Sequence, residues 1–226
     1  PSAPCTGAEA TEMYRKGLAQ TLNSLGVLQG MQQRNNEAAE NFAAAGTEYQ
    51  KLADDHPSNP AYRKQVASSL GNLGVILMAQ GKNTEALSAL EVSNAATRIL
   101  VSQFPDVPEY QIALAGGLCN TGSLLMNLHQ NEESLECFES AVTTLESVLG
   151  RDPRIPAARG FLANSYGSKA KILAELGRVD EAVVASDKAI SWVENNRRSG
   201  FVMMKYGILA QTDPQRATAE VEQFLS

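Results

Sequence analysis

The stretch PAYRKQVASSLGNLGVILMAQGKN, residues 60–83, contains the pattern that decides the fold. The triplet Tyr62-Arg63-Lys64 near its start recurs 48 residues earlier as Tyr14-Arg15-Lys16, and Tyr110 follows 48 residues later. A small residue inside the stretch keeps the same spacing without a gap, at Gly26, Gly74, Gly122 and Ala170. Self-similarity at a fixed period indicates an array of equal structural units.

Each unit has the pattern of a helical hairpin. Leu18, Leu22, Leu25 and Leu28 are spaced four, three and three residues apart, which places them on one face of a helix. A turn signal follows, seen as Gly81-Lys82-Asn83, and then a second apolar helical series: Ala38, Phe42, Ala45, Tyr49 and Leu52. The sequence therefore predicts an all-α fold of about five hairpins with a 48-residue period.

Proline pairs mark the expected boundaries between the units. In Pro57 and Pro60, as in the later pairs, the first proline stops one helix and the second suits the first turn of the next. We expect units at 8–59, 60–107, 108–155 and 156–197, and a shorter fifth hairpin at 198–226 with helices over 201–211 and 214–225. Residues 1–7 read as a linker. The units 8–226 are expected to form one solenoid domain, and the first residue, Pro1, suggests a piece of a longer protein.

The repeat resembles the tetratricopeptide repeat. The matching residues in the second unit are Leu70, Leu73-Gly74 and Leu77 of the first helix and Ala86, Leu90 and Ser93 of the second. The resemblance implies a right-handed α–α superhelix that binds a protein or peptide on its concave face. The period departs from the family's 34 residues, and we expect the extra residues at the start of the first helix and in the second helix. A HEAT-type solenoid has a compatible period but lacks these motif residues.

A narrower resemblance concerns the parent protein. The segments 70–74, LGNLG, and 104–110, FPDVPEY, are similar to the C-terminal repeat regions of planctomycete-type bacterial serine/threonine protein kinases. The chain has no kinase signature of its own, neither the catalytic-loop motif nor a glycine-rich phosphate loop. The alternative function is therefore that of a regulatory or spacer region that docks on its own kinase domain.

Composition argues against several other classes of protein. The net charge is −6 and no basic stripe is visible, which disfavours nucleic-acid binding. The longest apolar run, residues 75–79, is too short to span a membrane. Three irregularly spaced cysteines form neither a disulfide framework nor a zinc motif and suggest reduced thiols in the cytoplasm. His56 and His129 read as loop residues, so we expect no catalytic centre, metal or cofactor.

The resemblance also implies where a partner would bind. The family's inward-facing positions lie on the first helix of each hairpin, the A helix. Carried onto this chain, they give a mostly uncharged set, which we call the A-helix sites: Asn23, Val27, Asn72, Val75, Met78, Asn120, Ser123, Met126, Asn127 and Lys171. Asn72 and Asn120 are poor helix formers placed in mid-helix. They either bind a peptide backbone or hydrogen-bond the neighbouring repeat. We expect a monomeric, elongated interaction module and no enzyme.

Overall fold

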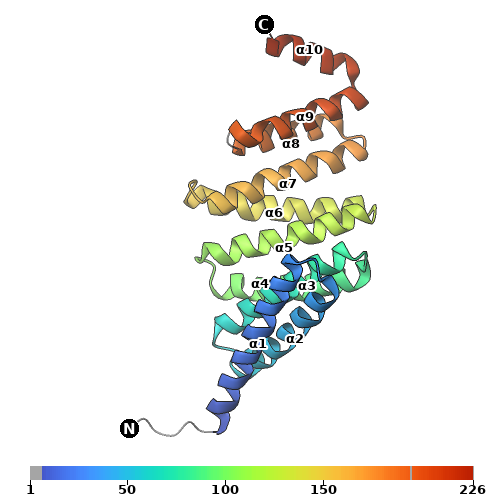
Figure 1. Ribbon diagram of the computed structural model, residues 1–226. Coiled ribbons are helices and arrows are strands. Elements are labelled where there is room, and N and C mark those ends of the chain that lie inside the picture. Colours follow the sequence, from blue (N-terminus) through green and yellow to red (C-terminus); the bar gives the residue numbers. More distant parts are fainter. Residues whose placement is uncertain (1–6, 194, 226) are drawn as a thin grey trace. The chain divides into compact units, whose positions relative to one another are not determined.

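The computed structural model describes residues 7–193 and 195–225, and within these ranges it contains ten helices and no strand (Figure 1). The odd-numbered helices are the first helices of successive hairpins and are called A helices below; the even-numbered ones are the B helices. Their bounds are α1 Gly7–Met31, α2 Asn35–Asp55, α3 Pro60–Ala79, α4 Asn83–Gln103, α5 Pro108–Asn127, α6 Asn131–Arg151, α7 Pro156–Glu175, α8 Val179–Trp192, α9 Asn195–Thr212 and α10 Pro214–Leu225. The predicted all-α repeat of hairpins is confirmed.

At a larger scale than the 48-residue repeats, the chain divides into two compact units: the first unit, residues 1–110, and the second unit, residues 111–226. The first unit holds α1 to α4 and the first residues of α5, and the second unit holds the rest. The prediction of a single solenoid domain over 8–226 stays a prediction.

Helix ends follow the proline pairs. Pro60, Pro108 and Pro156 are the first residues of α3, α5 and α7, where a missing backbone N–H costs nothing. The Asn59 side chain caps α3 by accepting a hydrogen bond of 3.1 Å from the Ala61 N–H. The last turn of α2 ends with the His56 N–H donating to the Leu52 carbonyl.

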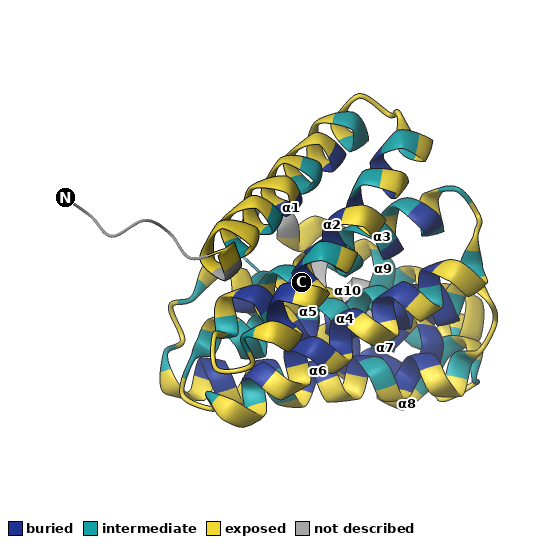
Figure 2. Cartoon of the chain, turned by 90° about the horizontal axis from the view of Figure 1, so that it is seen from below, coloured by how far each residue is buried: buried dark blue, intermediate teal, exposed yellow. Residues whose placement is uncertain are grey.

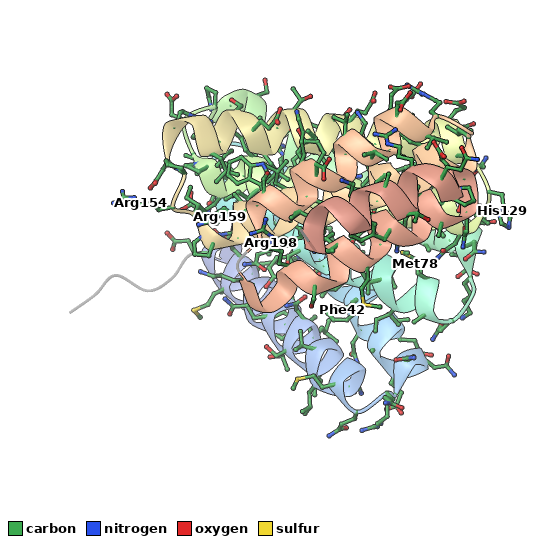
Figure 3. All side chains as sticks on the ribbon, turned by 90° about the horizontal axis from the view of Figure 1, so that it is seen from above. Phe42, Met78, His129, Arg154, Arg159 and Arg198 are labelled. Carbon is green, nitrogen blue, oxygen red and sulfur yellow. The ribbon has the colours of Figure 1, made fainter. Side chains whose placement is uncertain are left out.

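The turn between the A and B helices needs a residue with positive φ. Gly81 has φ 72° and Gly177 φ 74°, which glycine adopts without strain. The same repeat position holds Gln33 with φ 60° and His129 with φ 58°. His129 is thus the turn residue that the sequence predicted (Figure 3).

At this repeat position, each of the three glycines of the A helices lies against a large residue of its B helix. A Cβ added at Gly26 would lie 2.9 Å from Phe42 Cδ1, and one at Gly122 would lie 2.9 Å from Phe138 Cε2. At Gly74 the distance to Leu90 Cγ would be 2.6 Å. Where the A helix has Ala170, the equivalent B-helix residue is the smaller Ser186, and both are fully buried. The pairing explains why glycine is accepted in mid-helix despite its cost.

The B-helix residues predicted as core are buried: Ala38, Phe42, Ala45, Tyr49 and Leu52. In the first unit, α2 packs on α3, and Tyr49 and Leu52 join Tyr62 and Val66 in one apolar cluster. α1 differs because no described helix covers its equivalent side. Tyr14 is 71% exposed and Leu18 37%, whereas Tyr62 and Val66, one period later, are 5% and 1% exposed. Figure 2 shows this exposure along α1.

Several boundaries differ from the prediction. α1 begins at Gly7, the last residue of the expected linker, and residues 1–6 lie outside the described ranges. α9 begins at Asn195 rather than at 201, and α8 has only 14 residues. α10 matches the predicted range.

Candidate functional site

In the first unit, five A-helix sites lie on the neighbouring helices α1 and α3. Asn23 and Val27 belong to α1, and Asn72, Val75 and Met78 belong to α3 (Met78 is labelled in Figure 3). Val27 and Val75 are 43% and 45% exposed, and the other three are half-buried. All five are therefore accessible to a partner.

Asn23 joins the two A helices. Its Oδ1 accepts a hydrogen bond of 3.0 Å from Ser69 Oγ of α3. Asn72 and Asn120 stand one residue later in the repeat than Asn23. Neither has a side-chain hydrogen-bond partner among the described residues. Asn23 thus has the structural role that we considered for the other two asparagines, whereas Asn72 and Asn120 keep both amide groups available.

In the second unit, four A-helix sites lie on α5, namely Asn120, Ser123, Met126 and Asn127, and Lys171 lies on α7. Asn127 and Lys171 are exposed, and the rest are half-buried. The contact equivalent to Asn23–Ser69 is Cys119 Sγ at 3.0 Å from Ser165 Oγ. A polar contact therefore links successive A helices in both units.

Among the described thiols, Cys119 is in a setting that opposes reactivity. Cys119 and Cys137 form no disulfide bond with a described residue and are half-buried, and Cys5 lies outside the described residues. Burial raises the pKa of the Cys119 thiol, more than the hydrogen bond with Ser165 lowers it. A raised pKa keeps the thiol protonated at neutral pH, whereas nucleophilic chemistry needs the thiolate.

His56 holds three helices together at the end of α2. Its Nε2 lies 3.3 Å from Glu12 Oε2 of α1, and its ring centroid lies 5.8 Å from that of Tyr62 of α3. The Tyr62 hydroxyl donates a hydrogen bond to the same Glu12 carboxylate. That hydrogen bond, with burial adding to it, raises the pKa of Tyr62 to about 12. The predicted loop role of His56 is confirmed, with a packing role added.

Metal-ligating side chains do not gather in the part of the chain that the structure describes. Within the described ranges, no three His, Cys, Asp or Glu side chains are grouped closely enough to hold a metal ion. Among the same residues, no helix combines the length and the apolar character that crossing a membrane requires.

Two leucines that the sequence predicted only as packing residues line a groove. Leu70 and Leu73 were assigned to the packing motif, yet both are half-buried and line a groove between α2 and α4. The signal that would have revealed them is a change of chemistry at fixed repeat positions, because the residue two periods after Leu73 is Lys169.

Comparison with protein families identifies the repeat. Residues 66–103 match one tetratricopeptide-repeat family model and residues 163–196 match another. These two segments are therefore similar to the tetratricopeptide repeat. The two matches begin at the same repeat position to within one residue, and each leaves out the first turns of its A helix. The place of the extra length within the 48-residue unit stays a prediction.

Comparison with solved structures supports the same fold. A Podosopora anserina protein described as a kinesin light chain with nearly identical TPR-like repeats superposes with a TM-score of 0.67 at 18% identity, over 90% of this chain and 92% of that chain. A variant of the same protein that differs by one substitution gives a TM-score of 0.67 at 19% identity, over 90% and 91%. At this identity the likeness concerns the fold alone, a TPR-like solenoid. A search of curated proteins found no match.

Proposed function

We propose that the chain is a non-catalytic protein-interaction module that binds a peptide or protein domain through its A-helix sites. Tetratricopeptide repeats generally mediate protein–protein contacts. The observation that carries the proposal for this surface is the pair Asn72 and Asn120, which are accessible and have no hydrogen-bond partner among the described residues.

The chemistry of the A-helix sites favours an uncharged, tolerant mode of binding. An asparagine side chain offers one acceptor and two donor hydrogens, which suits the amide groups of a peptide backbone. Met78 and Met126 are half-buried, and flexible thioether side chains adapt to apolar partners of different shape. Lys171 is the one charged member of the set. The net charge of −6 supports a module that does not bind nucleic acid, and we place it in the cytoplasm as a monomer.

The alternative function is intramolecular docking on a kinase domain of a larger bacterial protein. It is favoured only by the motif likeness of residues 70–74 and 104–110. A kinase domain that is encoded in the same reading frame and binds the isolated chain would support it. The same A-helix sites would then contact the catalytic domain rather than a separate peptide.

The test of the A-helix sites is the double change Met78→Glu with Met126→Glu. Peptides selected on the wild-type chain from a random display library are the probe, and binding is measured by calorimetry beside helicity by circular dichroism. We expect helicity to remain and affinity to fall at least about tenfold, because two carboxylates would have to be desolvated in the interface. The matched control is Met13→Glu with Met203→Glu, since these methionines are 68% and 75% exposed and are not A-helix sites.

Two outcomes contradict the proposal. The first is a folded double variant that binds the selected peptides as tightly as the wild type. The second is an unfolded double variant combined with normal binding by Asn72→Ala with Asn120→Ala, because the asparagine amides would then make no contact with the peptide backbone.

A further inference from the structure

A second surface lies on the opposite, B-helix side of the first unit. α2 and α4 flank a groove of about 890 Å³, and its floor is formed by Leu70, Leu73 and Leu77 of α3. The groove walls carry small residues, including Ala43 and Ala89, and Val92 of α4 is 44% exposed. An accessible volume of this size with an apolar floor falls in the range typical of ligand sites.

The second unit has a smaller groove, whose α7 and α8 residues stand at the same repeat positions as the α3 and α4 residues of the first. This groove lies beside α6, α7 and α8 and measures about 420 Å³. Two periods after Leu70, Leu73 and Val92, the residues are Tyr166, Lys169 and Lys188. The sites are thus equivalent by sequence position but differ in chemistry.

One aromatic ring and two lysines line the second groove. The Tyr166 hydroxyl donates a hydrogen bond of 2.5 Å to Glu146, and Lys188 Nζ lies 3.0 Å from the same hydroxyl and 5.1 Å from the ring centroid. Lys169 Nζ lies 2.8 Å from Glu139 Oε1. The ring and both ammonium groups therefore have partners within the chain.

In the first groove, the charged groups lack such partners among the residues that the structure describes. Glu40 of α2, Glu85 of α4 and Lys82 before α4 line it, and none of them has an ion-pair partner in the described ranges. Lys82 and Glu85 stand at the repeat position where Arg178 Nε lies 2.6 Å from Glu181 Oε1. The lining thus holds two carboxylates against one lysine, and its floor is apolar, which makes the groove complementary to a basic, apolar ligand.

We propose that the groove between α2 and α4 binds an amphipathic helix of a partner protein with leucine or aromatic residues on one face and lysine or arginine beside them. Leu70, Leu73 and Leu77 extend about 10 Å along α3, which equals about two helical turns. That length matches side chains at positions i, i+3 or i+4, and i+7 of a docked helix. The lysines of the partner face Glu40 and Glu85, as Lys169 and Lys188 face acids in the second groove. This site is separate from the A-helix sites.

The test uses a synthetic peptide on the intact chain. The probe is a fluorescein-labelled helix-forming peptide of about 18 residues, long enough to be helical, with Leu and Trp at i, i+3 and i+7 and lysines beside them. A second peptide has glutamate in place of lysine. Fluorescence anisotropy is expected to show binding of the lysine peptide and at least about tenfold weaker binding of the glutamate peptide.

Two variants of the chain decide where the peptide binds. Val92→Lys installs the residue type found at the equivalent position, Lys188, and is expected to weaken binding at least about tenfold. Ile99→Lys is the matched control: Ile99 is 43% exposed on the same helix, does not line the groove, and its replacement adds the same charge. Leu73→Lys, which copies the residue type of Lys169, probes the floor from a second helix, with helicity measured to confirm folding.

The proposal is overturned by any of three results. Equal losses for Val92→Lys and Ile99→Lys would mean non-specific attraction to an acidic protein. Wild-type binding by folded Leu73→Lys would show that the floor is not used. Self-association of the chain that disappears in Val92→Lys would mean that a second copy, rather than a basic helix, occupies the groove.

Discussion

At the residue scale, the glycines of the A helices are set by contacts rather than by backbone conformation. We expect Gly122→Ala to destabilise the chain by roughly 1–3 kcal/mol, because the new Cβ would lie 2.9 Å from the Phe138 ring. Denaturant midpoints of the variant and the wild type measure this loss.

Gly150 is the control for that prediction. It lies in the last turn of α6, and a Cβ there would meet no atom within 4 Å. Gly150→Ala should therefore stabilise the chain by about 0.5–1 kcal/mol through the lost backbone entropy of the unfolded state. Equal effects at Gly122 and Gly150 would contradict the packing of Gly122 against Phe138.

A second residue-scale prediction concerns the turns with positive φ. His129→Gly should stabilise the chain by up to about 1 kcal/mol, since a non-glycine residue in this region is strained. The reciprocal change, Gly177→His, should destabilise it by a similar amount. Thermal or denaturant unfolding of both variants checks the sign, and a stabilised Gly177→His would refute the strain argument.

The hydrogen bond from Tyr62 to Glu12 predicts a dependence on alkaline pH. The unfolded tyrosine loses its proton near its ordinary pKa of 10.0, whereas the folded one keeps it until a pKa of about 12. Stability from this contact is therefore complete below pH 10 and is lost as the pH rises from 10 to 12. Unfolding free energies of Tyr62→Phe should fall less steeply than those of the wild type over this range. Parallel curves would show that the contact is absent.

At the scale of elements, the two B-helix grooves make a reciprocal experiment possible. Tyr166→Leu, Lys169→Leu and Lys188→Val together give the second groove the floor and wall of the first. We expect this triple variant to bind about two equivalents of the lysine peptide where the wild type binds about one, because one docked helix uses one groove. Titration calorimetry gives the stoichiometry, and circular dichroism confirms that the variant is folded.

The sequence was sufficient to predict most of the elements because most boundaries have a local cause. Pro60, Pro108 and Pro156 start helices, and the positions of Gly81 and Gly177 give the turns. The early start of α9 at Asn195 was missed because residues 195–200 have no apolar periodicity to indicate a helix. The exposure of Leu18 was also not predictable from its pattern, since burial depends on a covering helix rather than on the residue itself.

The candidate sites were predictable only in part. The A-helix sites came from aligned repeat positions, and the structure leaves all ten accessible, although their role in binding stays a prediction. The groove over Leu70 and Leu73 depends on the distance between α2 and α4, which a pattern along one chain does not contain. The Asn23–Ser69 hydrogen bond likewise joins residues that are 46 positions apart.

At the scale of the whole molecule, charge separates the two proposed modes of binding. The A-helix sites contain one charged residue, so affinity for their ligand should change less than about twofold between roughly 50 and 500 mM salt. The lysine peptide for the B-helix groove meets Glu40 and Glu85 on a chain of net charge −6 and should weaken markedly over the same range. Calorimetry in a salt series tests both, and the same salt dependence for both ligands would contradict the distinction.

The side of α1 that no described helix covers affects the local unfolding of the first unit. Met13, Tyr14, Leu25 and Leu28 are between 41% and 71% exposed, so α1 has fewer apolar contacts to lose than α2 or α3. Regions with little buried apolar surface open at a lower free energy than the global transition. Amide protons of α1 should therefore exchange with deuterium ahead of those of α2 and α3, and a covering helix on Tyr14 and Leu18 would slow that exchange.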